Sequence, residues 1–184
     1  MAATSTMLPL GSPLPSFSLV DACSGRTVSD RDFAGAKAVL VSFLCNHCPY
    51  VVHVRDEYAR LERDYSPRGV AIVGINSNDV ATYPQDGPTH MKALAEKLGW
   101  GFPFLFDDTQ EVARAFHAAC TPEFYVFDGD KKLVYRVQLD DSRPSDDKPV
   151  TGRDVRAALD AVLSGSPVSE TQVPSVGCGI KWRR

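Results

Sequence analysis

Two cysteines stand close together in the run Cys45-Asn46-His47-Cys48, which follows an apolar segment of strand length and leads into a segment with helical spacing. Free backbone N–H groups and the positive end of a helix dipole at such a junction favour thiolate over thiol. Two thiols placed there are suited to disulfide exchange. The sequence therefore predicts redox chemistry at Cys45 and Cys48. Two packed core cysteines would fit poorly beside the polar Asn46 and His47.

The composition of the chain limits the classes of protein to which these two thiols could belong. The chain has 184 residues, 43% hydrophobic content and a formal charge of -3, which fits one compact unit with its own core. Basic residues gather on no segment, so we expect no nucleic-acid partner. No stretch of about 18 apolar residues and no basic leader occurs, so we expect no membrane and a cytoplasmic location. Five cysteines are an odd count that does not suit a disulfide-stapled secreted domain.

The elements that must position the thiols follow from the apolar pattern. Apolar runs alternate with helical patterns, which predicts an α/β fold with a central sheet. We expect neighbouring strands at residues 38–44 and 70–76, with a helix between them that ends at Pro67 and Gly69. Further predicted elements are a helix from Pro88, a hairpin at residues 124–137 and a last helix from Thr151.

Two segments remain, and both are expected to be loops over the surface: the polar residues 138–150, and the tail from Ser166, which returns to apolar and cysteine residues at its end. The first contains four aspartates that predict a solvated acidic loop rather than a divalent cation site, namely Asp140, Asp141, Asp146 and Asp147.

The order of these elements is similar to that of the thioredoxin superfamily: a strand, Cys-x-x-Cys, a long helix, an apolar strand, then Thr121-Pro122 before a hairpin. More narrowly, the chain resembles the peroxiredoxin-like redoxins, relatives of the alkyl hydroperoxide reductase and thiol-specific antioxidant family that carry a thioredoxin-type dithiol. The stretches that carry this resemblance are residues 45–51, 76–79, 120–124 and 177–182.

The resemblance implies a fold for the whole chain. It is a single thioredoxin-like domain over residues 1–184, with a central mixed β-sheet flanked by helices. The core is expected at about residues 13–165, between an N-terminal extension and a C-terminal tail at residues 166–184.

The resemblance also assigns roles to the two thiols, with Cys45 as the attacking nucleophile and Cys48 as the resolving cysteine. We expect Cys45 to be exposed at the end of its strand and Cys48 to lie about one turn into the helix. Asn46 and His47 are expected to support the site. His47 either stabilises the Cys45 thiolate or is an exposed loop histidine without a partner.

Thr121 and Pro122 occupy the place where the superfamily has a cis proline facing the dithiol. The backbone of Thr121 is then expected to pair with a bound polypeptide or thiol substrate. Cys120 and Cys178 are candidates for extra redox thiols, and Cys178 is either a third redox thiol or a small apolar residue that fixes the tail. Cys23 is expected to be a spectator.

The leading functional prediction is a thiol-disulfide oxidoreductase in which the Cys45–Cys48 dithiol acts on a protein or small-molecule disulfide. No Gly-rich dinucleotide fingerprint occurs, so no cofactor is predicted and an external thiol resets the pair.

Two alternatives stay open. The first is a thiol-dependent peroxidase of peroxiredoxin type, in which Cys48-Pro49 would match the peroxidatic Cys-Pro. Cys45 then replaces the family's Thr or Ser, Val41 stands near its expected Pro, and Thr121 near its expected Arg, so the donors that polarise peroxide are missing. The second alternative is a metal-binding module built on the same cysteines, although two cysteines alone do not complete a closed zinc site.

Overall fold

Seven strands form a mixed central sheet in the computed structural model, which describes residues 2–183. The strand order is β3-β2-β6-β5-β4-β8-β9, with β4, β5 and β6 parallel and the other neighbours antiparallel. The predicted neighbours β4 and β5 and the hairpin β8–β9 are confirmed. The strands are β1 (Ala2–Thr4), β2 (Ser18–Asp21), β3 (Thr27–Ser29), β4 (Ala38–Phe43), β5 (Val70–Asn76), β6 (Phe104–Phe106), β7 (Cys120–Thr121), β8 (Glu123–Phe127), β9 (Leu133–Val137) and β10 (Val176–Gly179).

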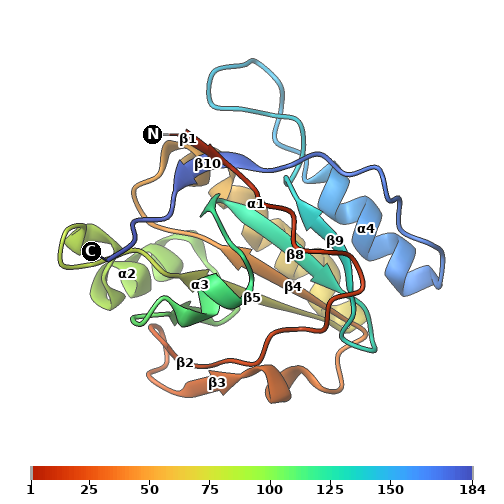
Figure 1. Ribbon diagram of the computed structural model, residues 1–184, viewed down its shortest axis with the longest axis horizontal. Coiled ribbons are helices and arrows are strands. Elements are labelled where there is room, and N and C mark those ends of the chain that lie inside the picture. Colours follow the sequence, from red (N-terminus) through yellow and green to blue (C-terminus); the bar gives the residue numbers. More distant parts are fainter. Residues whose placement is uncertain (1, 184) are drawn as a thin grey trace.

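Helices cover both faces of this sheet, as expected for the α/β class (Figure 1). The strand side chains alternate between two apolar clusters. One cluster packs against α1, α2 and α4, and the other against α3 and the N-terminal segment. The helices are α1 (Pro49–Tyr65), α2 (Pro88–Leu98), α3 (Glu111–Ala115) and α4 (Arg153–Ser164), with short 3-10 turns at η1 (Asp30–Phe33), η2 (Ser66–Arg68) and η3 (Pro84–Asp86).

Helix α1 carries the site and is fixed by its apolar stripe. Residues at helical spacing along one face, including Val54, Tyr58 and Leu61, are buried against the sheet. Pro49 opens the helix, where its missing N–H costs nothing. The helix ends before Pro67, as the sequence predicts.

A second, smaller sheet joins the two ends of the chain, in the order β1-β10-β7 (Figure 1). The expectation that the tail from Ser166 is only a surface loop is therefore wrong for β10. This strand pairs antiparallel with β1 on one side and with β7 on the other. The C-terminal tail thus reaches the edge of the element that contains Thr121.

No helix among residues 2–183 is both long enough and apolar enough to cross a membrane.

Candidate active site

The dithiol lies between the carboxyl end of β4 and the start of α1. Cys48 is the N-cap of α1 because the helix begins at Pro49. The expectation that Cys48 lies one turn into the helix is therefore wrong. The expectation that Cys45 is exposed is also wrong, because both Cys45 and Cys48 are 0% exposed.

Thr121 contacts both sulfur atoms from the opposite side. Its hydroxyl oxygen lies 3.3 Å from Cys45 Sγ, and its carbonyl oxygen accepts a 3.2 Å hydrogen bond from the thiol form of Cys48. The Thr121-Pro122 peptide bond is cis, as expected from the resemblance. The predicted meeting of Thr121 with the two cysteines is thus confirmed.

The two sulfurs differ in their preference for a proton. The Cys45 thiol donates a hydrogen bond to Cys48, which lowers the pKa of Cys48 well below its ordinary value despite its burial. The Cys178 thiol and the backbone N–H groups of Val51 and Cys178 also favour the Cys48 thiolate. That same bond to Cys48, together with burial and the charge of Asp86, raises the pKa of Cys45. Hydrogen bonds therefore favour Cys48 as the thiolate, while burial and the charge of Asp86 disfavour a thiolate at Cys45. This is the reverse of the order that the resemblance implied.

Cys178 completes a cluster of three thiols. It lies on β10 directly opposite Thr121 and packs against Cys45, Cys48 and Val51. Unlike the two dithiol cysteines, Cys178 is partly exposed. Burial and its hydrogen bond to Cys48 raise the pKa of Cys178 to about 11.

His47 turns toward a buried carboxylate. Its Nδ1 lies 2.7 Å from Asp86 Oδ2, in a polar contact without good hydrogen-bond angles, and its ring stacks on Tyr83 at a centroid distance of 5.2 Å. Of the two hypotheses for His47, the loop histidine without a partner is wrong. The other, stabilisation of a thiolate, has no direct hydrogen bond to support it.

Asp86 organises the loop between the two cysteines. Its carboxylate accepts hydrogen bonds from the backbone N–H of Asn46 at 2.8 Å and from the side chain of Asn78 at 2.8 Å. The Asn46 side chain donates to the carbonyl of Gln85. Sequence analysis missed Asp86 because nothing in η3 links it to the dithiol before the fold is known.

A candidate metal-ligand group also appears here. Cys45, His47 and Asp86 have potential ligand atoms within 4.8 Å of one another. Neighbouring ligand atoms around a tetrahedral zinc with bonds of about 2.0 Å stand about 3.3 Å apart. The 2.7 Å between His47 and Asp86 is shorter than that and corresponds to a direct polar contact. Cys48 is outside this group, so the metal-binding alternative and the dithiol share only Cys45.

Cys120 and Cys23 are outside the cluster formed by Cys45, Cys48 and Cys178. Cys120 is fully buried with its sulfur 3.9 Å from both Glu123 Oε2 and the carbonyl oxygen of Ser175. Burial and the charge of Glu123 raise the pKa of Cys120, which disfavours a reactive thiolate there. Cys23 lies in the turn between β2 and β3.

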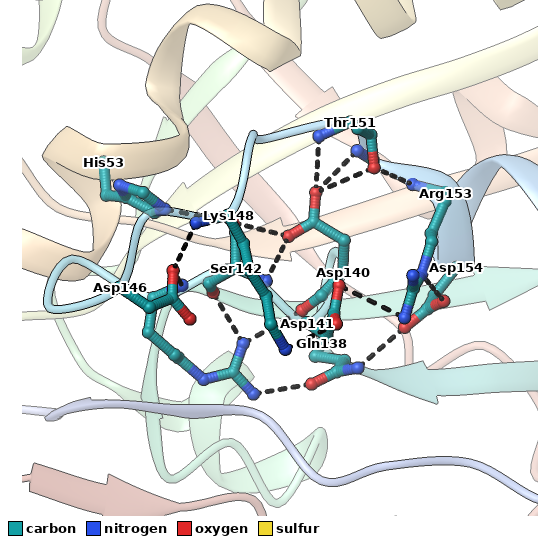
Figure 2. A network of polar contacts seen from close by, with 12 residues as sticks. His53, Gln138, Asp140, Asp141, Ser142, Asp146, Lys148, Thr151, Arg153 and Asp154 are labelled. Carbon is teal, nitrogen blue, oxygen red and sulfur yellow. Dashed lines mark hydrogen bonds and ion pairs between the residues drawn. The ribbon is translucent and has the colours of Figure 1, made fainter.

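The segment after β9 is only in part the solvated acidic loop that the sequence predicts, because one of its four aspartates is enclosed. Asp140 is buried and accepts hydrogen bonds from the backbone N–H groups of Thr151 and Gly152, both at 2.7 Å (Figure 2). Its other oxygen accepts from the backbone and hydroxyl of Ser142, and Ser142 in turn meets His53 on α1 at 3.0 Å. Asp140 therefore fastens this loop to α4 and α1, whereas Asp146 and Asp147 are exposed.

This topology, with Thr121 of β7 facing the two cysteines that precede α1, is that of the thioredoxin-like fold. Residues 9–154 match the model of the Redoxin family, and the chain belongs to that family.

Solved structures share the fold of this chain. The whole chain is similar, with 55% identity and a TM-score of 0.98, to 97% of an uncharacterized conserved protein from Geobacillus kaustophilus. It is 45% identical to a hypothetical protein from Sinorhizobium meliloti, with a TM-score of 0.96 and 98% of both chains covered. A thioredoxin-family thiol:disulfide interchange protein from Chlorobium tepidum, at 20% identity and a TM-score of 0.66 over 85% of this chain and 99% of that one, supports the fold alone. No curated protein matches the chain.

Proposed function

We propose that this protein is a thiol-disulfide oxidoreductase of the peroxiredoxin-like redoxin group, with Cys45 and Cys48 as its redox-active pair. The observation that carries the proposal is geometric: Cys45 and Cys48 pack together between the end of β4 and the N-cap of α1, and Thr121 contacts both sulfurs from the opposite side. The lowered pKa of Cys48 and the raised pKa of Cys45 support it. A low-pKa thiolate next to a protonated thiol is the arrangement that disulfide exchange requires.

In the proposed mechanism Cys48 attacks first and Cys45 resolves. Because both cysteines are buried with β10 in place, direct attack requires β10 to move aside. The Cys48 thiolate then attacks one sulfur of a disulfide, forms a mixed disulfide and expels the other sulfur as a thiolate. That thiolate takes up a proton as Cys45 loses one, and Cys45 then attacks Cys48 Sγ. The bond between Cys48 and the substrate sulfur breaks, and this second sulfur leaves as a thiolate that takes a proton from water. The products are a Cys45–Cys48 disulfide and two released thiols, so two electrons pass from the dithiol to the substrate. The Thr121 hydroxyl, 3.3 Å from Cys45 Sγ, supports the alignment of the resolving sulfur, whereas the Thr121 carbonyl accepts from Cys48 only in its thiol form.

The partners proposed for this cycle are a protein or small-molecule disulfide and an external thiol that resets the pair. A cytoplasmic setting suits the chemistry, because a reducing compartment keeps an odd set of five cysteines in the thiol form.

The proposal is tested by disulfide mapping and turnover. Trypsin leaves Cys45 and Cys48 together in residues 38–55, with Cys120, Cys178 and Cys23 on other peptides. After treatment with oxidised glutathione, peptide 38–55 should lose two hydrogens, and Cys48→Ser should abolish disulfide reductase turnover. An unmodified 38–55 peptide in a protein that still turns over would overturn the proposal.

Peroxide reduction is the second candidate function. The observation in its favour is the lowered pKa of Cys48 immediately before Pro49, the pair that resembles the peroxidatic Cys-Pro. Against it, Thr121 stands near the expected Arg, and within residues 2–183 no guanidinium hydrogen-bonds either sulfur. Charge on the peroxide oxygens would therefore lack a strong donor. A stopped-flow rate with hydrogen peroxide no faster than that of a free thiol would exclude this function.

A further inference from the structure

Strand β10 fills the edge at which a substrate backbone was expected. The sequence predicts that Thr121 pairs with a bound polypeptide, but in the structure Cys178 of the same chain pairs with Thr121, and Gly179 with Cys120. The C-terminal segment thus takes the position of a strand added to the edge beside the dithiol.

Gly177 shows how closely this strand is fitted. A Cβ atom at position 177 would overlap the carbonyl group of Thr121, the group that contacts Cys48 Sγ. Any larger residue there would separate β10 from β7. The absence of a side chain at Gly177 therefore lets the next residue, Cys178, reach the sulfur of Cys48.

The solvent exposure of the three clustered cysteines also singles out Cys178. Cys45 and Cys48 are 0% exposed, so an external thiol cannot touch either sulfur while β10 is in place. Cys178 is partly exposed and contacts Cys48. Within this cluster Cys178 is the cysteine that both solvent and the dithiol can reach.

We propose that Cys178 is a third redox residue that carries electrons between an external thiol and the buried Cys45–Cys48 pair through a Cys48–Cys178 disulfide. This inference rests on the proposed function, because it needs a dithiol that cycles.

The steps balance without any further reactant. In the oxidised protein, the Cys178 thiol loses its proton and attacks Cys48 Sγ; the Cys45–Cys48 bond breaks, and Cys45 takes up a proton. The Thr121 hydroxyl, 3.3 Å from Cys45, can donate to that departing sulfur. An external thiolate then attacks Cys178 Sγ and releases the Cys48 thiolate, a good leaving group because its pKa is low. A second external thiol frees Cys178 and departs as a disulfide; the reverse sequence oxidises the dithiol.

The pKa of Cys178 is expected to be lower in the oxidised protein, where Cys178 must act as the nucleophile, than in the reduced protein. Burial raises the pKa of Cys178, and so does its hydrogen bond to the Cys48 thiolate, while Lys181 lowers it. The oxidised protein has no Cys48 thiolate, so that contribution disappears when Cys178 must act as the nucleophile.

The first test traps the intermediate. In full-length Cys45→Ser, which cannot close the dithiol, diamide should link peptide 38–55 to peptide 157–181 through Cys48 and Cys178. Cys23→Ser in the same background is the matched control and should give the same link. A Cys45→Ser protein in which Cys48 and Cys178 stay unlinked, or link to other cysteines, would overturn the relay.

The second test separates the relay from the proposed function. Oxidised Cys178→Ser should keep its Cys45–Cys48 disulfide but lose about tenfold or more in its rate of reduction by glutathione, relative to Cys23→Ser. An unchanged rate would show that β10 simply opens, which would overturn the relay and leave the dithiol function standing. Failure of the wild-type protein to form the Cys45–Cys48 disulfide would instead remove the proposed function itself.

Discussion

Cys45 and Cys48 have the same side chain but different surroundings. Cys48 caps the first turn of α1, where backbone N–H groups favour an anion, whereas Cys45 lies beside the carboxylate of Asp86. The order of reactivity in a Cys-x-x-Cys motif therefore depends on which residue the helix begins at. Pro49 sets that boundary here.

The first prediction concerns the proton on Cys48. Cys45→Ala removes the thiol that donates to Cys48, so we expect the pKa of Cys48 to rise by about 1, the equivalent of one hydrogen bond to a charged group. Thiolate absorbance near 240 nm measures this pKa without requiring a reagent to reach the buried sulfur. Cys48→Ser should lose the low-pH ionisation, and Cys23→Ser should keep it. Persistence of that ionisation in Cys48→Ser would contradict the assignment.

At the level of single elements, β10 explains why the tail was difficult to predict. The four residues Val176–Gly179 include Gly177 and Gly179, which weaken any local preference for a strand. Their conformation comes from partners at the other end of the chain, β1 and β7. In contrast, continuous apolar runs predict the strands at residues 38–44 and 70–76 from the local sequence alone.

Gly177 gives a direct test of this element. Gly177→Ala places a Cβ atom against the Thr121 carbonyl, so we expect β10 to separate from β7. Cys178 should then react faster with a maleimide, and the pKa of Cys48 should rise because the Cys178 donors are removed. Gly35→Ala is the control, since a Cβ atom there meets nothing within 4 Å. Equal labelling of the two variants would show that β10 is not held as described.

The loop between β9 and α4 illustrates a second limit of sequence analysis. A run of aspartates predicts solvation, yet Asp140 is buried because the backbone N–H groups at the start of α4 need an acceptor (Figure 2). Composition cannot identify which aspartate of a run will be enclosed. The difference depends on the path of the loop across α1 and α4.

Asp140→Asn tests that enclosure. Although burial raises it, hydrogen bonds from Ser142, Thr151 and Gly152 bring the pKa of Asp140 below its ordinary value. An amide turns its NH₂ toward at least one of these donors, so we expect a loss of about 1–3 kcal/mol in the free energy of unfolding at neutral pH.

The pH dependence of that loss follows from the sign of the shift. Because the pKa of Asp140 is lower in the folded state than in the unfolded state, its ionised form stabilises the protein at every pH above the unfolded-state pKa. This stabilisation is lost as the pH falls through the folded-state pKa. The difference between wild type and Asp140→Asn in urea unfolding should therefore shrink in acid. Asp147→Asn, exposed in the same loop, should match wild type throughout. A difference that stays constant down to acid pH would contradict this account.

For the whole molecule, the sequence predicts the arrangement of the sheet and helices better than it predicts the burial of the two active-site cysteines. The dithiol, the neighbouring strands β4 and β5 and the hairpin were accessible from motif spacing and apolar runs, and the approach of Thr121 to the dithiol was accessible from the resemblance to the thioredoxin superfamily. Full burial of Cys45 and Cys48 was not, because it results from β10 and η3 closing over them from distant parts of the chain. Long-range contacts of this kind leave no local signature.

The thiolate links the redox state to the stability of the whole molecule. In the reduced protein the pKa of Cys48 is about 5 when folded and near the ordinary 9.0 when unfolded, so between these values the unfolded chain binds more protons. The free energy of unfolding of the reduced protein should thus rise with pH in this window, by at most about 1.4 kcal/mol per pH unit. Cys45 and Cys178, whose pKa values are raised, stay protonated there in both states.

Comparison of the two redox forms isolates this contribution. Ionisable groups remote from the dithiol have the same surroundings in both forms, so their effects cancel in the difference, whereas the Cys48 thiolate exists only in the reduced form. We expect urea unfolding to show that the reduced protein gains stability relative to the oxidised protein between about pH 5 and pH 8. Reduced Cys48→Ser is the control and should show no such gain. Parallel pH profiles for the two redox forms of the wild type would mean that the folded state does not stabilise the Cys48 thiolate, and the proposed order of attack would fail with it.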